Sequence, residues 1–199
     1  MPPYEYRKMS ERERQEVLAY RRFCKVPLHE PPHSFSGVGT YIISAACYEH
    51  RHIMASADRR KYLQKMLISS ISEIPESDIK TWVILPNHYH ILLSVDLKML
   101  KERLTKIHRY SALSWNRQDA QQGRRVWFRF SDRRMKSDRH FFTSINYIHS
   151  NPVKHGYVEN VTDWPCSGIH LWTEEYGLDY LRTLWSDYAV LDYGDGWDD

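Results

Sequence analysis

The pattern of apolar and polar positions divides residues 40–150 into short strands and amphipathic helices. Residues 40–47 (TYIISAAC) form a continuous apolar run, which predicts a buried first strand. Residues 81–95 hold two aliphatic and β-branched runs on either side of a Pro-Asn break, which indicates two strands joined by a turn. Residues 125–130 (RVWFRF) alternate enough to predict a fourth strand.

Apolar residues recur at helical spacing in three further segments: residues 57–71, 97–116 and 138–150. Pro75 follows the first segment, and Pro152 is expected to stop the third one near Asn151. Residues 10–23 indicate a surface helix, and the Pro-rich residues 27–39 indicate a linker or an extended arm.

These elements follow one another as strand, helix, strand, strand, helix, strand, helix. That order predicts an α+β fold, in which an antiparallel sheet carries its helices on one face, as in ferredoxin-like and RRM-like proteins. We accordingly divide the chain into an N-terminal helix and arm (residues 1–39), a core domain (residues 40–172) and an acidic C-terminal tail (residues 173–199).

Composition and cysteine use exclude several protein classes. The 199-residue chain is 42% hydrophobic and 27% charged, which is ordinary for a globular protein. Its start lacks the apolar core of a signal peptide, and no apolar run approaches the ~18 residues of a membrane span. Three widely spaced cysteines predict neither a disulfide framework nor a structural zinc site. We therefore expect a soluble, cytoplasmic protein.

The formal net charge of +3 conceals an uneven distribution. Residues 101–136 hold eleven basic against three acidic residues, whereas residues 174–199 hold eight acidic residues against one arginine. The basic stretch also contains Trp115, Trp127, Phe128 and Phe130, and such interleaving is typical of a nucleic-acid surface. A solvated charged face is the alternative. We further hypothesise that the acidic tail folds over the basic surface and competes with DNA.

His88 and His90 lie two residues apart on the second strand of the hairpin. Successive strand side chains alternate faces, so both imidazoles point the same way, while Tyr89 points the other way. Such a pair is suited to hold one cation. The alternative is two histidines on a half-exposed strand.

Tyr147 and Asn151 are four residues apart in the helix 138–150, so they share a face and approach a common point. A tyrosine hydroxyl beside a metal site can act as a nucleophile on phosphorus. A phenol is mostly protonated at neutral pH and needs help from a base, a cation or a water chain. A tyrosine that packs its ring in the core is the alternative.

The motifs together resemble those of the REP-associated tyrosine transposases, which belong to the HUH single-strand endonucleases. The matching segments are residues 41–51 (YIISAACYEHR), 85–93 (LPNHYHILL), 147–158 (YIHSNPVKHGYV) and 163–165 (DWP). The resemblance implies that His88 and His90 are the HUH metal ligands, that Tyr147 is the nucleophile and that Asn151 completes the metal shell. Cys166 and Gly168 depart from the family pattern, in which an aromatic residue and a serine are usual.

The resemblance also implies a reaction, a cofactor and partners. Mg²⁺ or Mn²⁺ would suit two imidazoles and an amide oxygen with open positions for water or phosphate. Attack by Tyr147 would give a 5′-phosphotyrosine on single-stranded hairpin DNA, in a monomer or homodimer associated with the nucleoid. The candidates for contacting the DNA backbone are Arg103, Lys106, Arg109, Arg125, Arg129, Arg133, Arg134 and Lys154.

Several alternatives stay open. A non-catalytic RRM-like reader would bind single strands without metal. A metal phosphodiesterase would use activated water instead of Tyr147. Four further histidines are candidates for metal binding or proton transfer: His108, His140, His149 and His155.

Overall fold

The computed structural model describes residues 10–12, 15 and 38–194. Contacts divide the chain into two compact units, residues 1–36 and residues 37–199. Of the predicted helix 10–23, residues 11, 12 and 15 are helical, and the rest of it lies outside the described residues together with most of the predicted arm.

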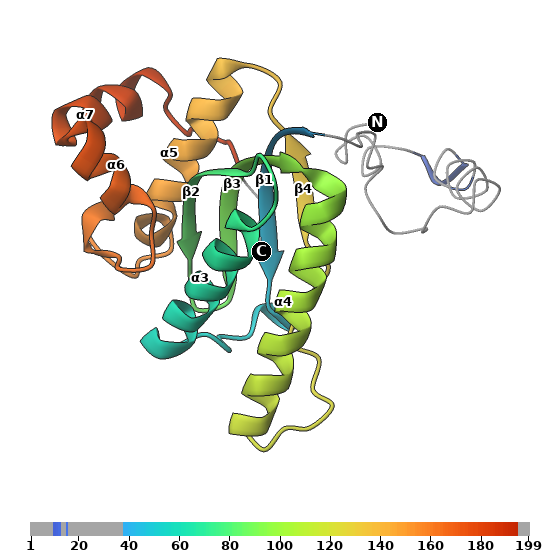
Figure 1. Cartoon of the computed structure of the whole chain (residues 1–199). Coiled ribbons are helices and arrows are strands. Elements are labelled where there is room, and N and C mark those ends of the chain that lie inside the picture. Colours follow the sequence, from blue (N-terminus) through green and yellow to red (C-terminus); the bar gives the residue numbers. More distant parts are fainter. Residues whose placement is uncertain (1–9, 13–14, 16–37, 195–199) are drawn as a thin grey trace. The chain divides into compact units, whose positions relative to one another are not determined.

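Four antiparallel strands form the sheet of the second unit, in the order β2-β3-β1-β4 (Figure 1). They are β1 (Val38–Ala46), β2 (Asp78–Ile84), β3 (His88–Asp96) and β4 (Ser131–Arg134). β2 and β3 meet at the Pro-Asn turn, which the Leu85 amide closes by donating to the His88 carbonyl at 2.8 Å. The turn leaves His90 opposite Ser44 of β1 and opposite Val83 of β2.

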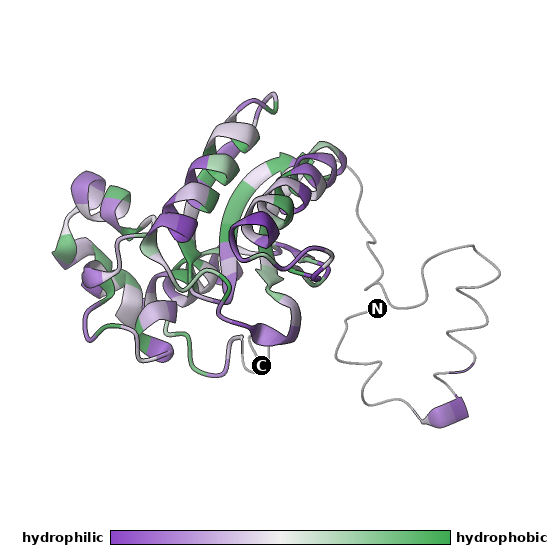
Figure 2. Ribbon diagram, turned by 90° about the horizontal axis from the view of Figure 1, so that it is seen from below, coloured by the Kyte–Doolittle hydropathy of each residue, from purple (hydrophilic) through white to green (hydrophobic). Residues whose placement is uncertain are grey.

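Two helices cover one face of the sheet, and a third helix lies against the other. Tyr89 of β3 bonds to His108 of α4 (Leu97–Gln118), which packs beside α3 (Ala57–Ser72). The neighbouring His90 points the opposite way, toward Tyr147 of α5 (Asp138–Lys154). In Figure 2 the hydrophobic stretches lie on the strands, between the helices.

The predicted fold class is confirmed, but the placement of all helices on one face is wrong for α5. The first six residues of β3 are buried on both faces of the strand. A strand of that kind needs a cover on each side. α3 and α4 provide one cover, and α5 provides the other.

The prediction of a fourth strand at residues 125–130 is also wrong, because regular pairing with β1 begins only at Ser131. Residues 126–128 instead lie antiparallel beside the end of β1 without regular pairing. Trp127 forms an isolated bridge with Cys47, and the Phe128 amide donates to the Ala46 carbonyl at 2.9 Å. Val126 and Trp127 are both buried, so this stretch lacks the alternating burial of a strand.

Pro152 does not stop α5, which runs to Lys154 and so contains Asn151. Proline lacks only its own N–H donor, and in the last turn this removes a single helical bond. The His155 amide closes the turn by donating to the Asn151 carbonyl at 3.1 Å. The predicted end at residue 150 is therefore too early.

The departure from the family pattern at Gly168 has a steric reason. The segment around Ser167 pairs with the outer edge of β2, and the Gly168 amide donates to the Trp82 carbonyl at 2.8 Å. A Cβ on Gly168 would lie 2.6 Å from Thr81 Oγ1 and 2.9 Å from the Trp82 amide nitrogen. Glycine is what permits this close approach.

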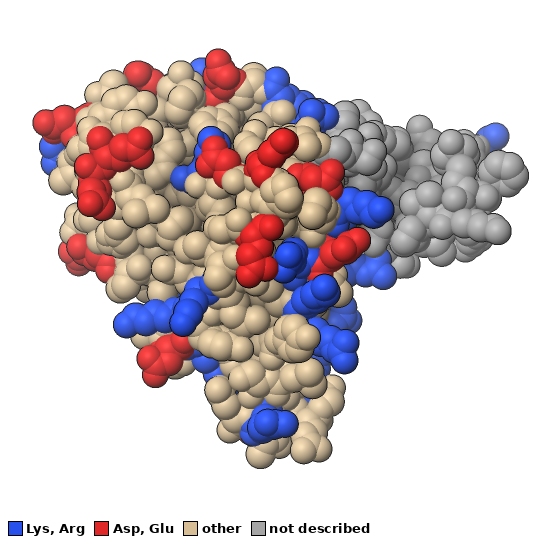
Figure 3. All heavy atoms as spheres, viewed as in Figure 1, with Lys and Arg blue, Asp and Glu red and all other residues tan. Residues whose placement is uncertain are grey.

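The C-terminal segment forms α6 (Ile169–Tyr176) and α7 (Leu178–Asp187), which follow the short 3₁₀ turn η2 (Val161–Asp163). α7 packs on α5, where Asn146 Nδ2 donates to the Leu184 and Tyr188 carbonyls at 2.9 Å each. Figure 3 shows acidic side chains over α6 and α7 and basic side chains along α4. Within the described residues, the tail thus packs on α5, not on α4. Among all the described residues, no helix combines the length and the apolar composition of a membrane span.

Candidate active site

The two histidines of β3 lie side by side and are almost fully buried. Their ring centroids are 5.1 Å apart, and their exposed fractions are 2% and 1%. His88 Nδ1 lies 2.8 Å from Asn87 Oδ1, and His90 Nδ1 lies 2.6 Å from Ser44 Oγ. These contacts occupy the Nδ1 atom of each ring, so both Nε2 atoms face α5.

α5 brings Tyr147 and Asn151 to these two nitrogens. The Tyr147 hydroxyl lies 3.4 Å from His90 Nε2, and Asn151 Oδ1 lies 3.0 Å from His88 Nε2. The structure therefore brings together every residue that was predicted from the motifs to hold the metal or to attack phosphorus.

The arrangement around His88 fits a bound cation. An amide oxygen only accepts hydrogen bonds, so His88 Nδ1 must donate to Asn87. In a neutral imidazole Nε2 then carries a lone pair, and it faces a second acceptor, Asn151 Oδ1, at 3.0 Å. Two acceptors at this distance repel unless a proton or a metal ion lies between them. Within residues 38–194 and the described part of the N-terminus, no cluster of three or more His, Cys, Asp or Glu side chains could hold a metal, so an ion here would need the Asn151 amide oxygen beside the two histidines.

The end of the described chain covers the Tyr147 ring, which is fully buried. The Tyr193 ring lies 5.7 Å from it, and a Cβ on Gly194 would lie only 2.3 Å from Tyr147 Cε2. The Tyr193 hydroxyl is held by Ser144 Oγ at 2.6 Å and by His140 Nε2 at 3.0 Å. Burial raises the pKa of Tyr193 and lowers the pKa of His140, so both are neutral partners near pH 7.

The predicted DNA-contacting residues are distributed over both faces of the sheet. Lys154 and Arg133 lie on the face of the sheet that carries His90. Lys154 Nζ is 5.3 Å from the centroid of the Tyr147 ring, and Arg133 is paired with Ile42 of β1, whose side chain points to the same face as that of Ser44. Arg134 has the opposite orientation. Three more candidates belong to α4, on the face of the sheet opposite His90: Arg103, Lys106 and Arg109. Of these, Arg103 forms an ion pair with Glu73 at 2.8 Å.

The two remaining basic candidates, Arg125 and Arg129, lie within residues 125–130, beside the end of β1. Arg125 stacks over the rings of Tyr48 and Phe128, at 4.5 and 5.5 Å from their centroids. Both arginines are exposed.

Of the four further histidines, only His155 lies beside the pair on β3, with its ring centroid 5.0 Å from that of His88. His149 bonds to Thr81 Oγ1 at 2.8 Å, and His108 bonds to the Tyr89 hydroxyl at 2.9 Å. Burial lowers the pKa of both to about 3. They are therefore neutral structural residues, while His140 holds Tyr193.

Sequence reasoning missed Ser44, Asn87 and the Tyr193–Gly194 cover. Asn87 directly precedes the histidine motif, and that adjacency was the one available signal. Ser44 reaches His90 only through the register of β1 against β3, which the residue pattern does not give.

Comparison with known proteins supports the resemblance. No family model matches the chain. A putative REP-associated tyrosine transposase of Haemophilus influenzae is 33% identical over 99 residues, which are 44% of this chain and 56% of the relative. The REP-associated tyrosine transposase of Escherichia coli K12 is 32% identical over 99 residues, which are 47% and 54% of the two chains. The chain thus spans about half the length of these curated relatives.

A solved structure, of a REP-associated tyrosine transposase bound to a REP hairpin, superposes with a TM-score of 0.56 and 22% identity. The match covers 71% of this chain and 82% of that one. At this identity the likeness establishes the fold. The chain is therefore similar in sequence to REP-associated tyrosine transposases and has the fold of a solved one, as its motifs indicated.

Proposed function

We propose that this chain cleaves and rejoins single-stranded DNA at hairpins of the REP type by forming a covalent bond to Tyr147. The observation that carries the proposal is the convergence of the Tyr147 hydroxyl and Asn151 Oδ1 on the Nε2 atoms of the two β3 histidines, at 3.4 and 3.0 Å. A purely structural role would not require two buried histidines to face a tyrosine hydroxyl and an amide oxygen.

In the proposed reaction, the Tyr147 oxygen attacks the scissile phosphorus and the bond from phosphorus to the 3′ oxygen breaks. Tyr147 loses its proton, and the leaving oxygen gains one, so the products are a 5′-phosphotyrosine and a free 3′-hydroxyl. No water is consumed, and the reverse attack by a 3′-hydroxyl rejoins the strand. In this proposal, a helix that holds Tyr147 beside the phosphate would contribute to the rate by positioning the nucleophile.

His88, His90 and Asn151 would hold the divalent metal ion, Mg²⁺ or Mn²⁺. When bound, the ion would polarise the phosphate and stabilise charge on its oxygens. Asn87 and Ser44 are proposed to keep the two rings in the orientation seen, as outer partners of metal-binding histidines commonly do.

The relatives support the substrate class: they are named as transposases, an enzyme class that acts on DNA, and the solved one is bound to a REP hairpin. We infer that Lys154, whose Nζ lies 5.3 Å from the centroid of the Tyr147 ring, and Arg133, on the same face of the sheet, would contact phosphates of the bound strand. A protein that cleaves DNA hairpins would act in the cytoplasm, at the nucleoid.

An RRM-like reader, the main alternative, uses an open sheet face on which bases stack. Here α3 and α4 lie on one face, and α5 lies over β2 and β3 on the other. This coverage favours an enclosed site over a reading platform. Hydrolysis by activated water is distinguished only by experiment.

The test is a denaturing gel with labelled single-stranded hairpin DNA and Mn²⁺. We expect a metal-dependent, denaturant-resistant adduct in the unmodified protein, and none in Tyr147→Phe or His88→Ala. Tyr110→Phe, which changes an exposed tyrosine of α4, is the matched control and should behave as the unmodified protein. Cleavage that persists in Tyr147→Phe would point to activated water, and binding without cleavage would favour the reader.

A further inference from the structure

A hollow of about 840 Å³ lies between the first turn of α3 and the last turns of α4. Its size is in the range of small-ligand sites. The lining is polar and aromatic and includes His52, Tyr62, Ser114 and Gln118. None of the residues proposed to hold the metal or to attack phosphorus lines it, so the hollow is separate from the site described above.

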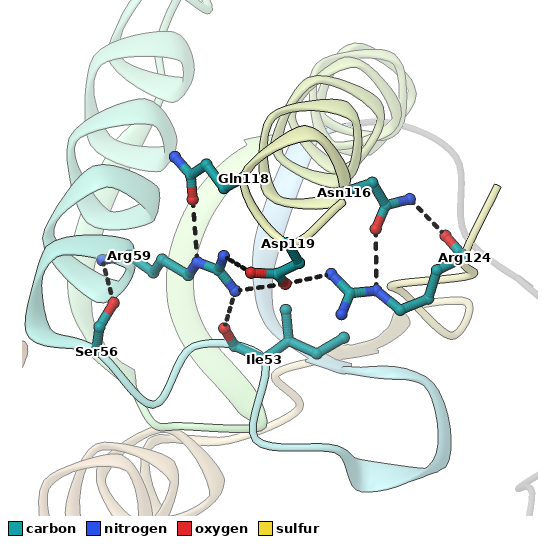
Figure 4. A network of polar contacts seen from close by, with 7 residues as sticks. All are labelled: Ile53, Ser56, Arg59, Asn116, Gln118, Asp119 and Arg124. Carbon is teal, nitrogen blue, oxygen red and sulfur yellow. Dashed lines mark hydrogen bonds and ion pairs between the residues drawn. The ribbon is translucent and has the colours of Figure 1, made fainter. Parts of the chain in front are cut away.

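The walls of the hollow are fixed by the ion-pair network in Figure 4. Arg59 of α3 donates to both carboxylate oxygens of Asp119, just after α4, and also to the Ile53 carbonyl at 2.9 Å. Arg124 donates to the same carboxylate at 2.7 Å. These hydrogen bonds, first from Arg59 and then from Arg124, lower the pKa of Asp119 to about 2. The network stays ionised near neutral pH and connects the loop at Ile53, the start of α3 and the end of α4.

The loop that lines the hollow is bonded to the turn that carries His88. The Met54 amide donates to the Pro86 carbonyl at 2.8 Å, and the Cys47 amide donates to the Asn87 carbonyl at 2.6 Å. The hollow and the histidine pair therefore lie at the same end of the sheet, one on either side of residues 47–56.

A series of rings connects the two places. His155 lies 5.0 Å from His88, Tyr157 lies 6.2 Å from His155, and His52 lies 6.4 Å from Tyr157, all between ring centroids. His52 is exposed and also lines the hollow, while His155 and Tyr157 are half-buried. Ring faces of this kind stack on unpaired bases without regard to sequence. A strand of only a few nucleotides would be long enough to follow these rings from His88 to the hollow.

We propose that the hollow binds one unpaired base of the strand that flanks the scissile phosphate, and that the strand reaches it along His155, Tyr157 and His52. The proposal rests on the proposed function, since it assumes that DNA is the substrate. The Ser114 hydroxyl and the Gln118 amide group offer hydrogen bonds to a base edge. Gln118 Oε1 already accepts a hydrogen bond from Arg59 Nε at 3.2 Å, so the Gln118 NH₂ group points away from Arg59 and can donate to a base.

The test scans the flanks of a hairpin oligonucleotide with single abasic positions and measures the dissociation constant by fluorescence anisotropy in EDTA. One stacked base contributes about 1–3 kcal/mol, so one flank position should weaken binding by about 5- to 150-fold when its base is removed. An abasic position in the hairpin loop is the control and should change binding little.

Ser114→Trp, which fills the hollow, should weaken binding of the intact strand by a similar factor and should remove the effect of the sensitive abasic position. Leu113→Trp, which adds the same ring at an exposed position of α4 that does not line the hollow, is the matched control, with binding unchanged. His52→Ala changes an exposed side chain and should reduce the same positional effect, so the test does not depend on the folding of Ser114→Trp.

Three results separate the two proposals. An adduct with Tyr147 in the unmodified protein, with no flank position sensitive to Ser114→Trp or His52→Ala, overturns the base pocket and leaves the proposed function intact. A sensitive position without any adduct supports the pocket and contradicts the transesterification. Absence of DNA binding contradicts both.

Discussion

Tyr193→Phe tests whether the segment that covers Tyr147 controls access to it. The substitution keeps the ring and removes only the hydroxyl, which bonds to Ser144 Oγ at 2.6 Å and to His140 Nε2 at 3.0 Å. Each such bond contributes about 0.5–1.5 kcal/mol net. The covered state should therefore lose about 1–3 kcal/mol relative to the uncovered one, which corresponds to a factor of about 5–150 in their ratio.

The reason for an effect on DNA is that Tyr147 is fully buried in the covered state, so a strand can reach it only after the segment moves. When the competent state is a minor one, the apparent dissociation constant is inversely proportional to its population, so a larger population of the uncovered state tightens binding. We expect Tyr193→Phe to form the adduct about tenfold faster at subsaturating DNA.

The assay is the initial rate of adduct formation, measured beside Tyr180→Phe, which makes the same chemical change on an exposed residue of α7. Gly194→Ala should act in the same direction as Tyr193→Phe, because its Cβ cannot coexist with the Tyr147 ring. Equal rates in Tyr193→Phe, Gly194→Ala and the unmodified protein would show that this segment does not control access to Tyr147.

Three further predictions concern stability and are checked by urea unfolding. Gly168→Ala should lower the free energy of unfolding by about 2–3 kcal/mol, because the new Cβ would lie 2.9 Å from a backbone atom. Gly123→Ala, whose Cβ would have no neighbour within 4 Å, should lower it by only about 1 kcal/mol, because of the positive φ at this position. Equal losses in the two variants would contradict the steric explanation. Asp119→Asn should cost about 1–2 kcal/mol by weakening two arginine contacts, and the exposed Asp179→Asn should cost almost nothing. His149 has a folded pKa of about 3, below the unfolded value of about 6.5, so its contribution is complete above pH 6.5 and is lost as the pH falls toward 3. His149→Gln should therefore reduce the slope of stability against pH between 6 and 4 by about 1.4 kcal/mol per unit, and an unchanged slope would show that His149 is not the group responsible.

The order of strands and helices was predictable because each element has its own hydrophobic period. The failures have local causes. Residues 125–130 alternate like a strand, yet Trp127 turns inward to stack on His108, at 4.4 Å between ring centroids. Pro152 favours a helix end, but tertiary packing buries it and continues the helix by one turn. The helix that covers the second face of β3 could not be assigned from the sequence, because this helix, α5, is distant from β3 along the chain.

The core of the site was predictable because its spacings are local: two residues apart on a strand and four apart on a helix place side chains on one face. Contacts between distant segments were not. Ser44 meets His90 through strand register, and Tyr193 meets Tyr147 through the path of the C-terminal segment. For the same reason the basic residues, which form one stretch in sequence, lie on both sides of the sheet.

The most direct test of the central claim is to identify the amino acid that becomes linked to DNA. The adduct formed with Mn²⁺ is treated with nuclease and trypsin and analysed by tandem mass spectrometry. Cleavage after Arg139 and Lys154 gives the peptide 140–154, in which Tyr147 is the single tyrosine. We expect a 5′-linked nucleotide on Tyr147 of this peptide. A nucleotide on any other residue, or cleaved DNA with an unmodified peptide, would contradict it.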